Sequence, residues 1–354
     1  MIVGGEFYED DRWLTDERML STAGMTFLNG GKACLLLIGD YLLDHGIKSI
    51  LLPSYLCPDI VTTLEQCGLN CAYYQIRPDF SIDLQDLTEK VGLHQAVYFI
   101  HYFGFLPAPA VRDTLLNLRQ KGVLVVEDNA QAGFTAQPMG DFIFNSIRKL
   151  APYDGGYLST PLNITPYIQK YHGIPNRRLP LIRAYRKGLA EYLYQGTDSY
   201  DELVSLYTLT EEVYASDSVV EGDILEREQI EHLDWPGIKQ RRRENYAYLL
   251  NLLMEIPELQ PIFSVLQEEI MPLGLPVYVN RGLRDELHDY LGEAGIGLTI
   301  HWHQLLTDPR LNGNPVAVDM ASRILTLVID QRTSHKQMDR MVQTIMSWLN
   351  KRKK

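Results

Sequence analysis

A pair of acidic residues at the end of an apolar run is the first feature of the sequence that could carry chemistry. Val125 and Val126 close that run, and Glu127–Gln131 (Glu-Asp-Asn-Ala-Gln) follows directly. One carboxylate at the end of a buried strand would suit a salt bridge to the protonated ring nitrogen of a heterocyclic cofactor, a charge that makes such a ring an electron sink. An Asp at this position also commonly caps the next turn. The motif alone favours neither interpretation.

A lysine lies a short distance downstream, between two further strand-like runs. Lys149 follows the apolar run that ends at Phe144, and a turn at Asp154–Gly156 (Asp-Gly-Gly) leads into the next run. This arrangement could hold the ε-amine over the edge of a sheet. A lysine amine near a cation or in a dry site has a lowered pKa and readily forms a Schiff base. Taken by itself, a lysine is more often a solvated surface residue.

These side chains need a scaffold, and residues 30–160 have the pattern of one. Short runs rich in Val, Ile, Leu, Tyr and Phe alternate with amphipathic stretches such as Ala33–Asp44 and Ala110–Gln120. Several runs lack polar alternation, as in strands that are covered on both faces. The pattern predicts an α/β fold with a mostly parallel sheet flanked by helices, and ligands at the carboxyl ends of its strands. The predicted strands are Ser49–Leu52, Cys71–Ile76, Ala96–His101, Val123–Glu127, Asp141–Phe144 and Gly156–Leu158.

The remainder of the chain predicts a helical region and then a second domain. Residues 161–230 are polar and helical in pattern, and a long helix at Trp235–Met254 should link the two domains. We therefore expect a large domain over residues 1–235, with an N-terminal arm over about 1–20, and a small α+β C-terminal domain over residues 236–354. The elements predicted in the small domain are strands near Pro276–Val279, Leu298–His301 and Ile324–Val328, and helices near Leu283–Ala294 and Lys336–Trp348.

Taken together, the two motifs resemble the DegT/DnrJ/EryC1/StrS family of sugar aminotransferases, a branch of the fold-type I enzymes that use pyridoxal phosphate (PLP). That family has an acidic pair and Ala-Gln after a strand, then a serine, the Schiff-base lysine, and an acidic residue with Gly-Gly. Glu127–Gln131, Ser146, Lys149 and Asp154–Gly156 follow the same order. Asn29–Ala33 (Asn-Gly-Gly-Lys-Ala) resembles the family's phosphate loop. Further matches are Pro53–Tyr55, His101–Gly104, His301-Trp302 and Ile324–Asp330.

The resemblance implies the aspartate-aminotransferase fold (PLP-dependent transferase fold type I), PLP as the cofactor, and a role for each matching residue. Lys149 would form the Schiff base and shuttle a proton between the substrate carbon and the cofactor carbon. Asp128 would pair with the pyridinium nitrogen, and Gln131 would lie near the ring hydroxyl. The backbone amides of Gly31 and Lys32 would hold the phosphate, since helix N-termini bind anions and glycine allows a close approach.

Some positions depart from the family pattern and indicate a divergent member. Cys57 occupies the position of the aromatic residue that stacks on the PLP ring, and Tyr55 is the nearest aromatic side chain that could replace it. Ser146, which the resemblance places at the phosphate, lies closer to Lys149 than in the commoner form of the family. Lys32 replaces a small residue of the phosphate loop.

Composition limits the partners and the location. The net charge of -12 argues against nucleic acid, whose binding needs clustered Lys and Arg. No stretch has the length of a membrane-spanning helix, and four cysteines in 354 residues do not make a disulfide framework, so we expect a cytoplasmic protein. His301 and His303 share one face of a predicted strand, but no third ligand accompanies them, and no metal is expected.

These observations predict an aminotransferase. It would move an amino group from an amino-acid donor such as glutamate to a keto group on a small molecule, for which a nucleotide-linked keto-sugar is one candidate. Active sites of the family form at the interface of a homodimer, so a homodimer is expected. Arg332 is the nearest candidate for clamping a substrate carboxylate.

Three alternatives compete with the aminotransferase. A PLP-dependent dehydratase of this family would have His in place of the lysine, and Lys149 argues against it. A non-catalytic binding or regulatory protein could keep the fold, but it would need neither Asp128 nor Lys149. A nicotinamide-dependent oxidoreductase is disfavoured because no Gly-x-Gly-x-x-Gly follows the first strand.

Overall fold

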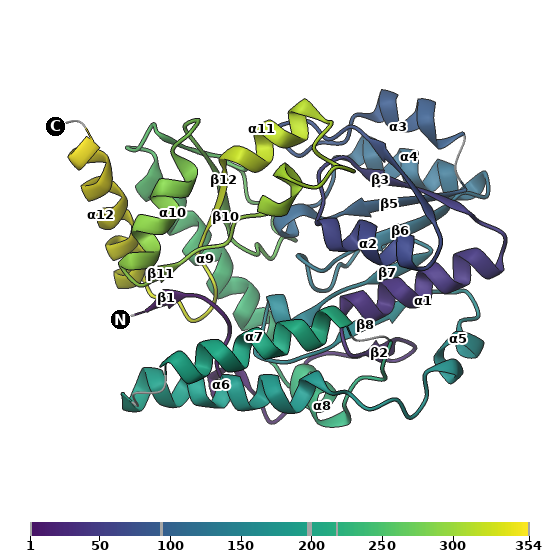
Figure 1. Cartoon of the computed structure of the whole chain (residues 1–354), viewed down its shortest axis with the longest axis horizontal. Coiled ribbons are helices and arrows are strands. Elements are labelled where there is room, and N and C mark those ends of the chain that lie inside the picture. The colour runs from purple at the N-terminus through teal and green to yellow at the C-terminus, as the bar shows by residue number, and fades with distance from the viewer. Residues whose placement is uncertain (1, 93–94, 197–199, 217–218, 353–354) are drawn as a thin grey trace.

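A seven-stranded sheet dominates the computed structural model, which describes residues 2–92, 95–196, 200–216 and 219–352. Its strand order is β2–β8–β7–β6–β5–β3–β4 (Figure 1). Strands β3 to β7 run parallel to one another, whereas β8 is antiparallel to both of its neighbours, β7 and β2. The bounds are β2 Thr26–Leu28, β3 Ser49–Pro53, β4 Asn70–Tyr74, β5 Ala96–Ile100, β6 Leu124–Asp128, β7 Phe142–Phe144 and β8 Gly156–Ser159.

The prediction of a mostly parallel sheet is confirmed, and each of the six strands expected between residues 30 and 160 is present. The central parallel strands β3, β5 and β6 are buried along most of their length, which explains their apolar runs without alternation. The sequence did not predict β2, because three residues are too few to show a period of two.

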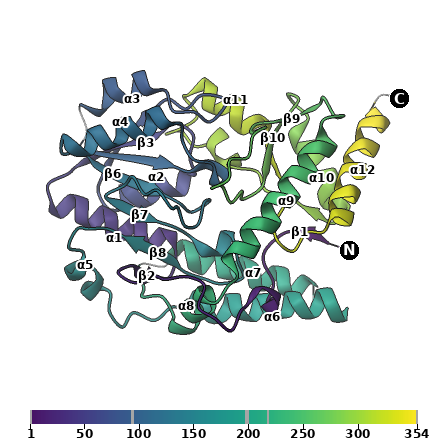
Figure 2. The same ribbon diagram turned by 180° about the vertical axis from the view of Figure 1, so that it is seen from behind.

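Helices pack against this sheet and against one another (Figure 2). In α1 the residues Cys34, Leu37, Ile38 and Leu42 are fully buried, because α1 packs between the sheet and the helices α2 and α5. None of the described helices is both long enough and apolar enough to cross a membrane. The bounds here are α1 Gly31–Asp44, α2 Pro58–Gln66, α3 Leu84–Val91, α4 Pro109–Gln120 and α5 Thr165–Lys170.

The helical region predicted at residues 161–230 is present and lies along one side of the molecule. Helices α6 (Arg178–Gln195) and α7 (Tyr200–Ser216) pack together and run beneath both halves of the structure in the two views (Figures 1 and 2). α8 (Ile224–Glu231) follows, and α9 (Trp235–Leu253) then leads to the C-terminal half. α7 is therefore placed to reach the end of the large sheet.

The C-terminal half contains two small sheets. The antiparallel sheet β12–β10–β9 and the parallel pair β1–β11 pack with three further helices. β1 comes from the start of the chain, so the N-terminal arm contacts both halves, and the division at residue 235 stays a prediction. The bounds are β1 Val3–Gly4, β9 Leu259–Pro261, β10 Leu275–Val279, β11 Ile296–Gly297, β12 Ile324–Leu327, α10 Arg284–Glu293, α11 Pro315–Arg323 and α12 His335–Arg352.

One predicted strand of the C-terminal half is wrong. Residues 298–301 are not a strand; the ladder stops at Gly297, and only an isolated bridge joins Thr299 to Thr326. The chain leaves the sheet here because it crosses to the large domain. The carbonyl oxygen of His301 accepts a hydrogen bond from the hydroxyl of Tyr55, and Trp302 packs on the ring of Tyr55.

Candidate active site

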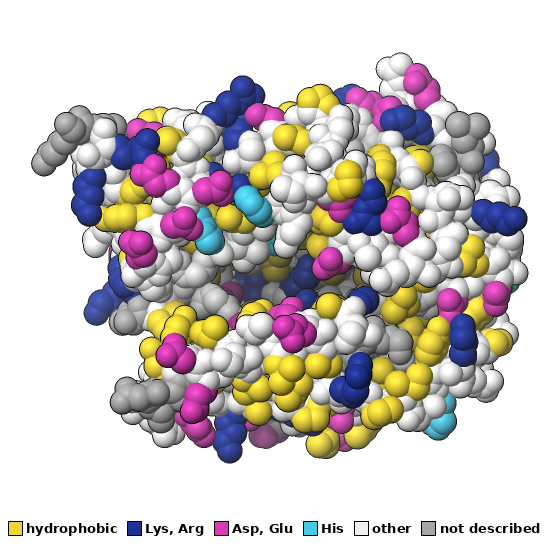
Figure 3. Space-filling view, in the orientation of Figure 1, with side chains coloured by type: hydrophobic (Ala, Val, Ile, Leu, Met, Phe, Trp, Pro, Cys, Tyr) yellow, Lys and Arg dark blue, Asp and Glu magenta, His cyan; other side chains and the backbone are white. Residues whose placement is uncertain are grey.

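A cavity of about 320 Å³ opens at the carboxyl ends of β5, β6 and β7, where a parallel sheet is expected to bind its ligand. On the surface, the molecule is hollowed above α7, and Lys and Arg side chains lie inside the hollow (Figure 3). All seven residues that the sequence proposed for the site line this cavity: Gly31, Lys32, Cys57, Asp128, Gln131, Ser146 and Lys149.

Asp128 is the carboxylate that β6 directs into the cavity. It is 5 % exposed, and its Oδ2 accepts a hydrogen bond of 2.5 Å from the hydroxyl of Tyr98 on β5. Its Oδ1 accepts from the backbone N–H of Ala130 at 2.7 Å. Burial raises the pKa of this carboxyl against the lowering effect of those bonds and of Lys149. A cationic partner in the cavity would therefore stabilise the ionised form.

Glu127 points to the other face of the sheet, as successive strand residues do. It is fully buried and accepts hydrogen bonds from His101 Nε2 at 2.9 Å and from the backbone N–H groups of Met139 and Gly140 at 2.6 and 2.8 Å. Burial raises its pKa, but these partners outweigh burial, and the net effect is a lowered pKa. The acidic pair thus divides into one structural carboxylate and one that faces the cavity.

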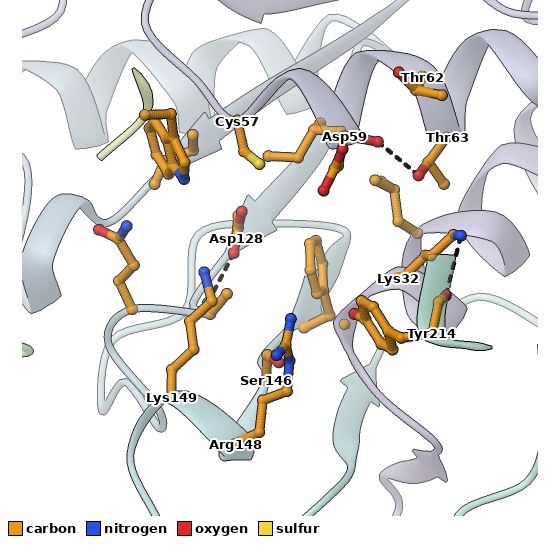
Figure 4. A pocket seen from close by; sticks show the side chains of 18 of the residues that line it. Lys32, Cys57, Asp59, Thr62, Thr63, Asp128, Ser146, Arg148, Lys149 and Tyr214 are labelled. Carbon is orange, nitrogen blue, oxygen red and sulfur yellow. Dashed lines mark hydrogen bonds between the residues drawn. The ribbon is translucent and has the colours of Figure 1, made fainter. Parts of the chain in front are cut away.

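Lys149 closes a short 3-10 turn at Ile147–Lys149 that directly follows β7. Its side chain points toward Asp128 in Figure 4. Burial lowers the pKa of the amine, and the charge of Arg148 adds to the lowering, while Asp128 and Cys57 oppose it. A lowered pKa increases the neutral fraction of the amine, which is the form that attacks a carbonyl carbon.

Gln131 presents an unused hydrogen-bond donor to the cavity. Its Oε1 accepts a 2.6 Å hydrogen bond from the backbone N–H of Phe103, so Nε2 is the other end of the amide. Nε2 is buried and bonds to none of the described residues. Phe103 adopts a left-handed conformation with φ of 54°, which is costly for a bulky residue, and the turn that contains it fixes the orientation of Gln131. A buried donor of this kind needs an acceptor.

The N-terminus of α1 and the residue Ser146 meet at another wall of the cavity. A Cβ atom on Gly31 would lie 3.2 Å from Cβ of Ser146, so glycine keeps this corner open. The amine of Lys32 donates to the carbonyl oxygen of Ala215 at 2.6 Å, which joins α1 to the end of α7. Glycine is also required at position 156, because a Cβ atom there would lie 2.6 Å from the carbonyl oxygen of Asn145. The corner combines backbone N–H groups with a hydroxyl, as an anion site does.

The aromatic residue that the sequence suggested as a substitute for Cys57 does not line the cavity. Tyr55 is fully buried behind the wall and packs against Trp302, with 5.5 Å between ring centroids. Trp302 lines the cavity instead. Cys57 itself precedes α2, and burial raises the pKa of its thiol, so it is protonated at neutral pH.

Several cavity residues were not proposed from the sequence, among them Tyr98, Arg148, Glu211 and Tyr214. Tyr98 is the one polar side chain within the apolar strand β5, and this was a usable signal. Arg148 adjoins Lys149 but has no motif of its own. Glu211 and Tyr214 lie on α7, and nothing in the sequence indicated that this helix reaches the cavity.

Two other residues considered from the sequence have structural partners. Arg332 pairs with Asp330 at 2.7 Å and donates to the carbonyl oxygens of Gly5 and Glu6, so it holds the N-terminal arm and is not a free carboxylate clamp. His303 contacts Arg284. In the described part of the chain no group of three His, Cys, Asp or Glu residues is arranged to hold a metal.

His301 leads to a prediction about stability at low pH. It is buried, its Nδ1 lies 2.9 Å from Oγ1 of Thr326, and burial with the charge of Lys149 lowers its pKa from 6.5 to about 3. Between these two pH values His301 is therefore neutral in the folded protein but protonated in the unfolded chain. The free energy of unfolding is highest above pH 6.5 and falls by up to about 1.4 kcal/mol per pH unit between pH 6.5 and about 3.

The matched variant is His301→Gln, which keeps a polar side chain but does not titrate. Urea unfolding between pH 7 and pH 4 should show a smaller loss of stability for the variant than for the wild type. Equal losses would mean that His301 is not held neutral in the folded protein.

Comparison with known proteins identifies the fold. No protein-family model matches the chain, and no curated protein matches its sequence. Among solved structures, the putative sugar aminotransferase Spr1654 from Streptococcus pneumoniae in its PMP form matches with a TM-score of 0.70 at 16 % identity, and the match covers 100 % of both chains. The sugar aminotransferase CalS13 from Micromonospora echinospora matches with a TM-score of 0.64 at 18 % identity, over 91 % of this chain and 87 % of that one.

A third solved structure gives the same result. Helicobacter pylori PseC, an aminotransferase involved in the biosynthesis of pseudoaminic acid, matches with a TM-score of 0.67 at 12 % identity, over 91 % of this chain and 86 % of that one. These likenesses extend over nearly the whole chain, so the predicted fold class, PLP-dependent transferase fold type I, is confirmed.

Proposed function

We propose that the chain is a PLP-dependent aminotransferase of the DegT/DnrJ/EryC1/StrS type. The observation that carries the proposal is that Asp128 and Lys149 face one cavity at the carboxyl end of the sheet, with the lysine directed toward the carboxylate. A buried carboxylate and an amine of lowered pKa are the two groups that a pyridine aldehyde requires of its protein. The likeness in fold to three aminotransferases supports this choice.

The other cavity residues fit the same cofactor. The unpaired Nε2 of Gln131 would donate to the ring hydroxyl, and the corner at Gly31 and Ser146 would receive the phosphate. Cys57 and Ala130 would contact the ring. Two observations support the fit. Nε2 of Gln131 is a buried donor without a partner among the described residues, and a Cβ atom on residue 31 would narrow the corner beside Ser146.

When bound, PLP supplies an electron sink for the electrons released at the substrate carbon. In the proposed mechanism Asp128 holds a proton on the ring nitrogen by charge pairing, and Tyr98 keeps the carboxylate in position. Lys149 would hold the cofactor by its aldehyde carbon, and its neutral Nζ would serve as the base that moves a proton from the substrate carbon to the cofactor carbon. Lys149 would therefore both anchor the cofactor and transfer the proton.

The substrates would enter through a second cavity. This cavity of about 280 Å³ shares Arg148, Lys149 and Trp302 with the first, and it also reaches His301 and the N-terminal arm. An amino-acid donor such as glutamate and a keto acceptor would occupy it in turn. A nucleotide-linked keto-sugar is the acceptor we propose, because the fold relatives include sugar aminotransferases.

Absorbance spectroscopy tests the proposal directly. Purified protein mixed with PLP is expected to develop a visible band that persists after gel filtration, and L-glutamate should bleach it as the amino group is transferred. Bovine serum albumin with PLP serves as the control for lysines that react without a site. The absence of a visible band would contradict the proposed aminotransferase and would favour a non-catalytic protein with this fold.

The proposal includes a homodimer in the cytoplasm. The exposed surface of α6 and α7 carries large apolar side chains, among them Tyr194, Tyr200, Val204 and Leu209, and α7 also lines the cavity. A second copy on this surface would lie next to the active site. The four cysteines are free thiols, which agrees with a reducing compartment. A mass of one chain in sedimentation equilibrium would contradict the dimer.

A further inference from the structure

A loose ion pair lies at the phosphate corner of the cavity. Nη1 of Arg148 is 3.5 Å from Oε1 of Glu211, longer than a good hydrogen bond, and Nε of Arg148 is buried without a partner among the described residues. The guanidinium also lies over the ring of Tyr214, 4.5 Å from its centroid. Arg148 therefore has donors to spare where the cavity is lined by Gly31 and Ser146.

Glu211 has a second and better partner. Its Oε1 accepts a hydrogen bond of 2.9 Å from Nη2 of Arg178, and Arg178 is also paired with the buried Asp154. If Arg148 turned to another anion, Glu211 would keep its bond to Arg178 and would not be left as an unpaired carboxylate. The exchange of partners by Arg148 would therefore cost little.

The position of Arg148 suits an anion on the cofactor. It lies between Ser146 and Lys149 in the chain, and in Figure 4 its side chain rises beside Ser146 toward Tyr214 while Lys149 turns toward Asp128. A ring held between Lys149 and Asp128 would place its phosphate on the side of Ser146 and the α1 N-terminus. A guanidinium binds a phosphate through two parallel hydrogen bonds, a geometry that a lysine cannot supply.

We propose that Arg148 is the side-chain ligand of the cofactor phosphate, and that Glu211 on α7 competes with the phosphate for its guanidinium. The inference rests on the proposed function and adds to it a way for the protein to respond to its cofactor. Without the phosphate, Arg148 pairs with Glu211 and so connects α7 to the site. With the phosphate bound, Arg148 bonds to the phosphate, and Glu211 keeps its hydrogen bond to Arg178.

The test compares PLP with pyridoxal, which carries the same aldehyde and ring but no phosphate. Dissociation constants of both would be measured from the visible band for the wild type and for Arg148→Gln, Glu211→Gln and Glu212→Gln. Arg148→Gln should weaken PLP by about 10- to 100-fold, the loss of a charge-assisted hydrogen bond, and should weaken pyridoxal far less, because pyridoxal loses only the effect of the Arg148 charge on Lys149. Glu211→Gln should tighten PLP by about 2- to 5-fold, and Glu212→Gln, an exposed neighbour on α7, should change neither.

Each outcome separates the inference from the proposed function. Formation of the pyridoxal band by Arg148→Gln shows that the variant is folded at the site; if it forms none, Arg148→Lys takes its place and should weaken PLP less severely. Unchanged PLP affinity in an arginine variant, or equal losses for PLP and pyridoxal, would overturn the role of Arg148. Unchanged PLP affinity in Glu211→Gln would overturn the competition. A wild type that forms no band with either compound would instead overturn the proposed function, and this inference with it.

Discussion

Replacing Lys149 with alanine is expected to abolish the visible band of the PLP-treated protein and to lower the rate of amino transfer by about 10⁴-fold or more. The size of the effect follows from the two tasks assigned to one amine, the bond to the aldehyde and the proton transfer. In the described structure Lys149 is directed at Asp128, whereas the other cavity lysine, Lys32, donates to carbonyl oxygens at the end of α7. Of the two lysines that line the described cavity, Lys149 is therefore the one placed to react.

Lys32→Ala is the matched control for this prediction. Borohydride reduction followed by peptide mass analysis should locate the cofactor on Lys149 in both the wild type and Lys32→Ala. The Lys149→Ala variant should still bind PLP without a covalent bond, since the phosphate corner and Asp128 are intact. A label on Lys32, or a band retained in Lys149→Ala, would contradict the assignment.

The second large effect is expected from Asp128→Asn. The amide has the same shape and can still accept from Tyr98, but it cannot pair with a positively charged ring nitrogen. Removing one member of a buried charge pair costs roughly 3–5 kcal/mol, which corresponds to a loss of about 10²- to 10⁴-fold in turnover. The band from Lys149 should still form, because the aldehyde chemistry does not need the carboxylate.

Measuring kcat for the half-reaction with glutamate distinguishes this role from a structural one. Asp59→Asn changes an exposed carboxylate that lines the same cavity and should leave kcat nearly unchanged. Thermal unfolding of the protein without cofactor should be altered little by Asp128→Asn, since burial already raises the pKa of that carboxyl. A variant that melts early but turns over normally would show that Asp128 supports the fold alone.

The part of the site that the sequence predicted is the part encoded locally. Asp128 ends one strand and Lys149 follows the next, so the strand pattern placed both at one edge of the sheet, whereas Gln131 and the role of each residue came from the family resemblance. The sheet itself was predictable because its strands are apolar runs between helices of clear period. Its parallel direction follows from the helical connections.

The part that the sequence did not predict depends on contacts between distant segments. Tyr98 reaches Asp128 across 30 residues, and Lys32 reaches Ala215 across 183. Local patterns record which face of a helix is apolar but not which cavity its polar side chains will enter. Glu211 and Tyr214 could not be placed for this reason, since α7 reads as an ordinary helix. Residues 298–301 failed as a strand because His301 bonds to Tyr55 and only Thr299 forms a bridge, to Thr326.

The pairing of β1 with β11 has a consequence for how the chain folds. Val3 is held against Ile296, so a strand of two residues completes its hydrogen bonds only after nearly the whole chain has been synthesised and the C-terminal half has formed. Contacts of such long sequence separation form late and slow the search for the native state. A fragment that begins at the long helix α9 would lack this strand and leave β11 as an open edge. The C-terminal half should therefore not behave as an autonomous folding unit.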